Sequence, residues 1–168
     1  MIVVSDTSPV TNLAAIGQLD LLQKLYGTIT IPLAVYNEMV IVDKVVPGAV
    51  EIRTLDWIKT EIVADAQRVK SIQITQEDID LGEAEAIILA LELDANLILM
   101  DERRGRAVAV NYGLKVTGLL GVLIQAKHNR LILDIKPLMD QLIKTAAFRI
   151  SSQLYADALM AAGEKVID

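Results

Sequence analysis

Two aspartates in this chain each follow a short aliphatic run of the kind that forms a buried strand. Asp6 comes after residues 2–5, and Asp101 comes after residues 97–100. Reactive groups in open parallel sheets collect beyond the carboxyl ends of the strands, near the point where the strand order reverses. We therefore expect both carboxylates at one edge of a sheet. The alternative is that each caps the following helix. For Asp6 the Ser8-Pro9 pair supplies a better helix start, whereas for Asp101 the alternative stays open.

Glutamates on two expected helices are the next candidates. In the helix expected over residues 81–93, Glu83 lies over an apolar stripe, where a charge is costly unless it is paired or bound to metal. The alternative is a capping box between Asp80 and Glu83, and the two roles can coexist. Glu85 lies on the more polar face, and we expect it to be solvated. Glu38, in an earlier helix, reads on its own as an exposed helical residue.

Carboxylates that converge without cysteine or several histidines would form an all-oxygen site. Such a site suits Mg²⁺ or Mn²⁺ rather than zinc, and the chain has no cysteine and a single histidine. These ions can turn bound water into a nucleophile and neutralise the charge that builds on a phosphodiester. The residues alone thus predict an acidic metal site, provided that the fold brings them together.

The elements that must position these acids alternate between strands and helices. A length of 168 residues fits one domain, and 53% hydrophobic with only 4% aromatic residues favours layered helices on a buried parallel sheet. We predict one α/β domain of three α/β/α layers with a mostly parallel twisted sheet, its core over about residues 1–130 and a helical extension over 131–168. Strands are expected at 2–5, 28–31, 57–63, 97–100 and 115–117. Helices are expected from Ser8, at 19–25, 32 to about Val42, 65–70, 81–93, 102–112, 119–129, 134–146 and 152–162, with a short one after residue 48.

The chain carries no sign of export or of a membrane span. Met1 leads directly into an apolar run with no basic segment before it. The most apolar stretch, residues 84–100, is interrupted by two glutamates, an aspartate and an asparagine, so it is too polar to cross a bilayer. The absence of cysteine favours a reducing compartment. We expect a cytoplasmic protein.

The net charge of −6 is unusual for a protein that binds nucleic acid, because such proteins carry a basic surface. A metal bound among the acids, or a local basic patch, would reconcile the two. Arg103, Arg104 and Arg106 follow Asp101 closely, where guanidinium groups could hold substrate phosphates. The same cluster is equally explained as the solvated start of a helix. Phe148 reads as a core residue rather than a platform for a base.

Several segments, weak one by one, form a specific set when taken together and in order. They are VSDTSP at residues 4–9, IPLAVYNE at 31–38, LGEAEAI at 81–87, LILMDERRG at 97–105, and KVTG at 115–118, which Gly121 follows. As a set they cover most of the chain and resemble PIN-domain proteins. The resemblance is to the PIN-like group formerly catalogued as a domain of unknown function and often placed beside toxin–antitoxin systems.

The resemblance implies a metal-dependent endoribonuclease with RNA as substrate, Mg²⁺ or Mn²⁺ as cofactor and an antitoxin protein as partner. Carried over by position, the four catalytic acids would be Asp6, Glu38, Glu83 and Asp101. Of these, the ion would be held by Asp6, Glu83 and Asp101. The chain departs from many PIN nucleases at the third acid, where Glu83 stands in place of an aspartate.

The resemblance and the basic cluster together suggest residues that contact the substrate. Ser8 would lie beside the first acid and hydrogen-bond within the site, and Arg103 and Arg104 are the candidates for holding RNA phosphates.

Two other functions stay open. A binding or regulatory module on the same fold, without turnover, is favoured by the acidic charge and by the glutamate at the third acidic position. A different phosphate- or nucleotide-binding α/β domain is disfavoured, because neither G-x-x-x-x-G-K-[ST] nor a strand-linked G-x-G-x-x-G is present. The apolar helices over 119–129 and 134–162 exceed what one small domain needs, which predicts a homodimer or a docked partner.

Overall fold

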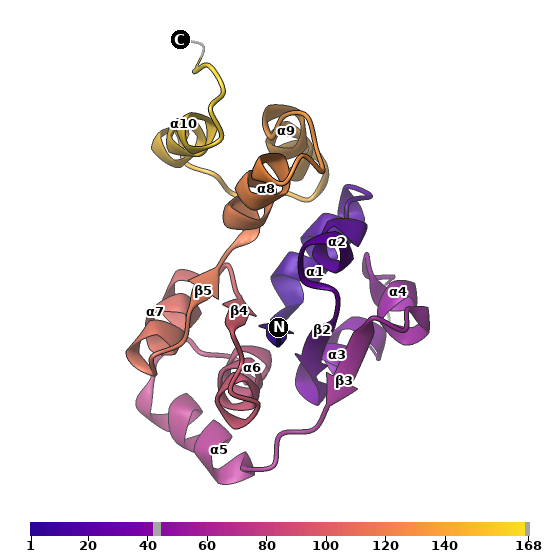
Figure 1. Cartoon of the computed structure of the whole chain (residues 1–168). Helices are drawn as coiled ribbons and strands as arrows, with labels where there is room; N and C mark the ends of the chain where they lie inside the picture. The colour runs from indigo at the N-terminus through magenta and orange to yellow at the C-terminus, as the bar shows by residue number, and fades with distance from the viewer. Residues whose placement is uncertain (42–44, 167–168) are drawn as a thin grey trace.

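A computed structural model describes residues 1–41 and 45–166 of the chain. Its centre is a sheet in which each pair of neighbouring strands is parallel, in the order β3-β2-β1-β4-β5 (Figure 1). This confirms the predicted α/β/α architecture, and each strand lies in or close to its expected segment. The strands are β1 (Val3–Ser5), β2 (Ile29–Pro32), β3 (Ile58–Glu61), β4 (Leu97–Leu99) and β5 (Val116–Thr117).

The order of the strands creates a switch point between β1 and β4. From β1 the chain moves outwards through β2 to β3, and it then returns to the opposite side of β1. There β4 pairs with β1 in a register that matches Val4 with Ile98. Open parallel sheets have a crevice at the carboxyl ends of the two strands that flank such a point. Asp6 and Asp101 follow these strands almost at once.

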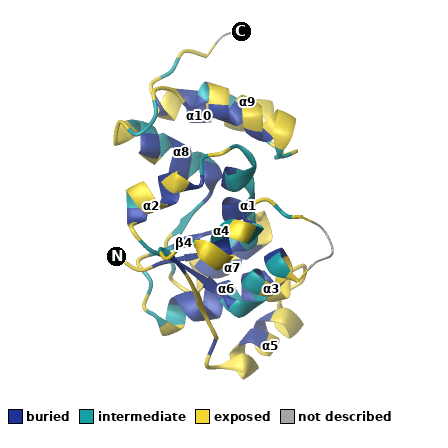
Figure 2. Cartoon of the chain, turned by 90° about the vertical axis from the view of Figure 1, so that its right-hand side faces the viewer, coloured by how far each residue is buried: buried dark blue, intermediate teal, exposed yellow. Residues whose placement is uncertain are grey.

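Side chains alternate across the sheet and form two hydrophobic layers. Val3 and Leu99 belong to one layer, whereas Val4 and Ile98 belong to the other. Figure 2 shows buried residues on the strands and on the helix sides that face them. The first layer receives side chains from α1 (Thr7–Ala15), α2 (Asp20–Tyr26), α3 (Leu33–Val40), α4 (Ala49–Thr54), α8 (Leu119–His128), α9 (Lys136–Thr145) and α10 (Ser152–Ala161). The second receives side chains from α5 (Ala66–Thr75), α6 (Leu81–Glu92) and α7 (Arg103–Asn111).

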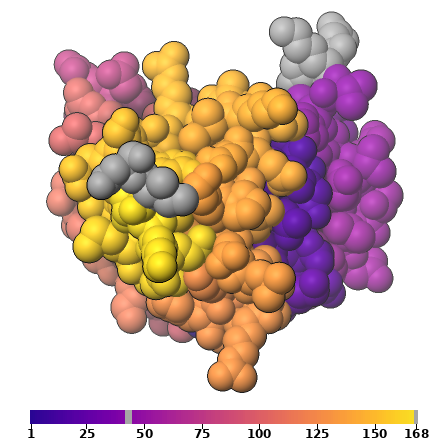
Figure 3. All heavy atoms as spheres, turned by 90° about the horizontal axis from the view of Figure 1, so that it is seen from above, coloured from indigo at the N-terminus to yellow at the C-terminus, as the bar shows by residue number. Residues whose placement is uncertain are grey.

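The last two helices share the first hydrophobic layer with the sheet. Leu142 on α9 and Leu159 on α10 are buried in the same cluster as Val3 on β1. Seen from above, this C-terminal part covers one end of the molecule beside the N-terminal segments (Figure 3). Much of the apolar surface that predicted a dimer is thus buried within the chain itself. Leu133 and Met160 nevertheless stay 91% and 68% exposed.

Three helix boundaries differ from the expected ones. The helix expected over residues 65–70 continues to Thr75. α1 begins at Thr7 with Asp6 at the N-cap position, so the prediction that Ser8 caps this helix was wrong. Ser8 lies within the first turn of α1, where its hydroxyl donates to Asp101 and accepts the side-chain amide of Asn12. α3 ends at Val40, and the expected end at Val42 lies outside the described residues.

Within residues 1–41 and 45–166, no helix combines the length and the apolar character that a membrane span requires.

Candidate active site

The two strand-end aspartates lie at the switch point of the sheet. The Asp6 amide donates to the Leu99 carbonyl of β4 at 3.0 Å, and the residue is only 5% exposed. Although Asp6 stands at the N-cap position of α1, its side chain makes no capping hydrogen bond there. Asp101 follows β4 and acts on Asp6 as a neighbouring negative charge. The Asp6 side chain therefore does not cap α1 in the way that the alternative prediction requires.

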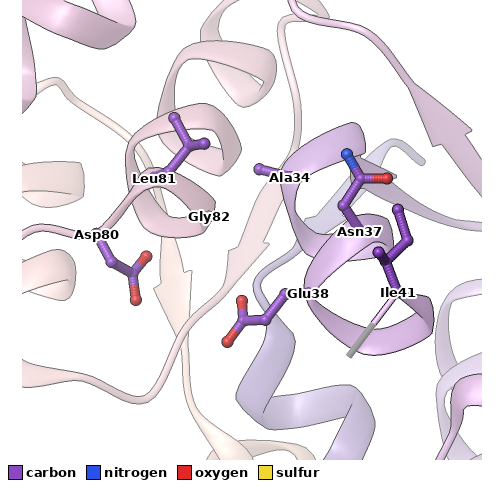
Figure 4. A pocket seen from close by; sticks show the side chains of 7 residues that line it. All are labelled: Ala34, Asn37, Glu38, Ile41, Asp80, Leu81 and Gly82. Carbon is purple, nitrogen blue, oxygen red and sulfur yellow. The ribbon is translucent and has the colours of Figure 1, made fainter. Parts of the chain in front are cut away.

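Two further carboxylates face Asp6, one from α3 and one from the start of α6. A Cβ atom on Gly82 would lie 3.3 Å from Glu38 Oε2. It would also lie 3.5 Å from Asp6 Oδ1 and 3.5 Å from Asp80 Oδ1. Figure 4 shows the Glu38 and Asp80 carboxylates pointing into the space between the two helices, beside Gly82. The missing side chain of this glycine thus leaves a space that three carboxylate oxygens surround.

Glu38 is exposed, as its helix predicted, but a hydrogen bond restrains its side chain. The Thr7 hydroxyl donates to Glu38 Oε2 at 2.7 Å. Thr7 follows Asp6 directly, so this hydrogen bond joins α3 to the loop that carries the central aspartate. The bond holds the end of the Glu38 side chain toward the other acids.

Glu83 is buried, with 4% of its surface exposed, and its two carboxylate oxygens differ. Oε1 accepts the Asp80 amide at 3.2 Å, and the Glu83 amide donates to Asp80 Oδ1 at 2.7 Å. This is the capping box that the sequence offered as an alternative. Oε2 is buried and has no hydrogen-bond partner among the described atoms. A buried carboxylate oxygen without a partner is costly, so this atom calls for a proton or a cation.

Burial and mutual repulsion raise the proton affinity of these acids. Burial raises the pKa of Asp6 from its ordinary 3.8 to about 7, and the charges of Asp80 and Glu38 add to the effect. Burial likewise raises the pKa of Glu83 to about 8, with further contributions from the charges of Asp80 and Asp6. The pKa of Asp101 is also raised by burial. Without a cation, the cluster therefore retains protons near neutral pH.

Asp101 is held in place by groups from three other parts of the chain. Its Oδ1 accepts the Leu119 amide at 2.8 Å, and its Oδ2 accepts the Ser8 hydroxyl at 2.9 Å. Asp101 therefore caps α8 rather than α7, the helix that follows it. The Arg106 guanidinium donates to the Met100 carbonyl at 3.0 Å, and its charge offsets part of the rise that burial causes in the pKa of Asp101. Ser8, predicted to hydrogen-bond within the site, donates to the last of the four acids.

The carboxylate oxygens suit a hard divalent cation as ligands, but they do not all lie around one ion position. Within residues 1–41 and 45–166, no three acidic, histidine or cysteine side chains stand close enough together to hold one ion. The predicted set of Asp6, Glu83 and Asp101 is thus not preassembled. Glu83 Oε1 belongs to the capping box, and each Asp101 oxygen accepts one hydrogen bond. The chemistry nevertheless fits Mg²⁺ or Mn²⁺, since the donors are carboxylate oxygens. The orphaned Glu83 Oε2 and the open space at Gly82 are features that a cation would satisfy.

The arginines that follow Asp101 have different surroundings. Arg104 is exposed and lies 3.8 Å from the Glu77 carboxylate, a weak surface pair. Arg103 lines a cavity of about 520 Å³ whose wall also includes Asp101. Of the two arginines predicted to contact substrate, only Arg103 is placed beside the acids in this way.

Two acidic residues, one at the N-cap of α6 and one within the helix, have contacts that the sequence did not predict. Asp80 was expected only as a helix cap, yet its carboxylate also faces Asp6. The signal was its place at the start of the helix that carries Glu83. Glu85 was expected to be solvated, and this was wrong: it is half-buried and accepts the Ala34 amide at 2.8 Å. It thereby satisfies a free amide at the start of α3, a contact between distant segments that no local pattern reveals.

Comparison with known families agrees with this fold. A parallel sheet with acids at its switch point is the framework expected for a nuclease-like α/β/α domain. The family model described as DUF3368, a PIN domain, matches residues 2–164. The chain therefore belongs to this PIN-domain family, which confirms the resemblance seen in the sequence. PIN domains generally use divalent metal ions. No curated protein and no solved structure gives a significant match to the chain.

Proposed function

We propose that this chain is an endoribonuclease that hydrolyses RNA phosphodiester bonds with Mg²⁺ or Mn²⁺. Asp6, Glu83 and Asp101 would hold the ion, Glu38 would assist, and Asp80 would add a carboxylate from the start of α6. The proposal is carried by the approach of carboxylate oxygens of Asp6, Glu38 and Asp80 to the open space at Gly82, at the switch point of the sheet. The buried Glu83 Oε2, which has no hydrogen-bond partner among the described atoms, supports a role for Glu83. Family membership supports it.

A bound divalent ion would supply an activated water and neutralise the charge that builds on the phosphodiester. The residues of the chain prepare the place for it. The Leu99 carbonyl anchors the Asp6 backbone, and Thr7 holds Glu38 toward the site. Ser8 and the Leu119 amide fix the orientation of Asp101. Because the acids retain protons, a cation must displace those protons before it can bind.

Replacement of Asp6 by asparagine tests the proposal, because it removes a charge and keeps the shape. Wild-type protein, purified free of contaminating nuclease, should cleave a fluorescent single-stranded RNA with Mn²⁺ and should not cleave it in EDTA. Asp6→Asn should lose about a hundredfold or more of this activity. Asp56→Asn, an exposed aspartate at the opposite edge of the sheet, is the matched control. Full activity in Asp6→Asn, or cleavage that ignores EDTA, would refute the assignment.

One observation favours a second function, a non-catalytic module of the same fold that binds nucleic acid or regulates a partner. The acids are not assembled around one point within the described residues, and the third acid is committed to a capping box. This alternative predicts RNA affinity without metal-stimulated cleavage. The same assay therefore separates the two functions.

For the biological setting, we infer a cytoplasmic toxin that an antitoxin protein holds in check. The family relationship and the absence of cysteine support this inference. Induced expression should arrest growth for the wild type but not for Asp6→Asn, and equal arrest by both would contradict a toxin role for this site.

We also propose a homodimer. It is supported by exposed apolar side chains of the C-terminal region, namely Leu133, Ile143, Leu154 and Met160. A monomer mass by sedimentation at micromolar concentration would overturn it.

A further inference from the structure

The side of the acidic site next to the C-terminal helices is basic, unlike the chain as a whole. The 520 Å³ cavity beside Asp101 is lined by Arg103, Arg106, Phe148 and Arg149, among other residues. A second cavity, of about 370 Å³, lies between the first turns of α1 and residues 146–149, and it shares Asp101, Phe148 and Arg149. The two cavities therefore meet at Asp101 and at the loop between α9 and α10.

The opposite side of the acids has a different character. There a cavity of about 480 Å³ is lined by Glu38, Asp80 and apolar or neutral residues, with no arginine or lysine among its described lining residues. A polyanion that reaches the acids would therefore be attracted from the side of the α9–α10 loop.

The loop between α9 and α10 is fixed at its centre. Ala147 has a positive φ of +53°, and the Phe148 amide donates to the Leu142 carbonyl at 3.0 Å. The Phe148 side chain is half-buried: it packs against the first hydrophobic layer and also lines both cavities. It is thus an anchored aromatic side chain on the wall of both cavities, rather than a wholly buried core residue.

The guanidinium groups around Phe148 have few partners of their own. Arg103 and Arg149 are exposed, and among the described residues neither takes part in an ion pair. Besides Asp101, the acid on these walls is Glu102, which is exposed. Guanidinium groups recognise phosphate bidentately, and a phosphate here would lie next to the acidic site.

We propose that Arg103, Phe148 and Arg149 form a subsite for one nucleotide of a single-stranded RNA. The two guanidinium groups bind the phosphate, and the aromatic ring stacks with the base. The proposal rests on the proposed function, because the subsite holds the strand whose phosphodiester reaches Asp101. The substrate is a single strand, since only an unpaired base can reach a ring set beside a cavity of this size.

Binding can be measured without cleavage in full-length Asp6→Asn protein. We would titrate a 5′-fluorescein single-stranded oligoribonucleotide by fluorescence anisotropy at several salt concentrations in EDTA. Adding Arg149→Ala should weaken binding about tenfold and reduce the slope of log K against log salt by about 0.7, because one phosphate contact is lost. Adding Phe148→Leu keeps an apolar side chain against the core and should weaken binding about fivefold to a hundredfold with an unchanged slope.

Arg53→Ala is the matched control, since Arg53 is exposed on α4, beside β3 at the far edge of the sheet. It should change neither the affinity nor the slope. Thermal unfolding checks that the Phe148→Leu variant is folded. If that variant is unfolded, Arg149→Ala still tests the subsite. The subsite is overturned if Arg149→Ala behaves like Arg53→Ala, if the parent binds no RNA, or if duplex RNA binds as tightly.

The two proposals fail in different ways. Cleavage by Asp6→Asn at the wild-type rate overturns the proposed function whatever the binding result. Unchanged binding by Arg149→Ala, in a protein whose cleavage does require Asp6, overturns the subsite alone.

Discussion

Replacing Asp6 by asparagine should stabilise the metal-free protein, and the gain should grow as the pH rises. Burial raises the pKa of Asp6 to about 7, so the folded state binds this proton more tightly than the unfolded state does. The wild type therefore loses stability as the pH rises from the unfolded value of about 4 through the folded value of about 7. Each pH unit of that interval is worth about 1.4 kcal/mol, which sets a ceiling of about 4 kcal/mol.

Urea unfolding of both proteins in EDTA, at about pH 4.5 and about pH 8, measures this gain. The two proteins should differ little at the lower pH, where Asp6 is protonated in the folded wild type. At the higher pH Asp6→Asn should be more stable by about 1 to 4 kcal/mol. Asp56→Asn, at the exposed opposite edge, should show no such trend. Equal stability of Asp6→Asn and wild type at pH 8, or a difference that does not vary with pH, would refute the reasoning about buried charge.

Three further results follow from the geometry. Mn²⁺ should raise the melting temperature of the wild type more at about pH 8 than at about pH 6, because protons on Asp6 and Glu83 compete with the ion. Differential scanning fluorimetry measures this shift, and an equal shift at both pH values would argue against binding at these acids. Gly105→Ala should lower the free energy of unfolding by about 1 to 3 kcal/mol in urea titrations, because the added Cβ would come within 2.5 Å of Glu83 Oε2 and of Met100 Sδ. An unchanged midpoint of urea unfolding would contradict this packing. Glu85→Ala should cost about 0.5 to 2 kcal/mol by leaving the Ala34 amide unsatisfied, while RNA cleavage stays at the wild-type level; loss of cleavage in a folded variant would show that Glu85 belongs to the site.

The sheet and most helices could be predicted because their signals are local. Short β-branched runs and helical periodicity repeat along the chain, and the strand segments lie where these patterns end. The alternation of strands and helices along the chain predicts a parallel sheet. It also predicts that Asp6 and Asp101 lie at the carboxyl edge of that sheet. The start of α1 was misjudged because the helix begins one residue earlier, with Asp6 rather than Ser8 at the N-cap position.

The finer structure of the site depends on contacts between distant segments, and such contacts cannot be recognised from a single sequence. The hydrogen bond of Thr7 to Glu38 and that of Glu85 to Ala34 each join α3 to another element. Arg149 reaches the walls beside Asp101 only because α9 and α10 fold back over α8, and nothing in its neighbourhood along the chain marks it as functional. Conversely, the Asp80–Glu83 capping box is a local motif, and the sequence offered it as one of two roles for Glu83.

Calorimetric titration of the metal-free protein with Mn²⁺ at about pH 8, where most of the acids have lost their protons, tests the idea of a carboxylate-held ion most directly. We expect saturable binding to the wild type and to Asp56→Asn, with binding to Asp6→Asn weakened about a hundredfold or more. Equal affinity of the wild type and Asp6→Asn for Mn²⁺ would contradict it.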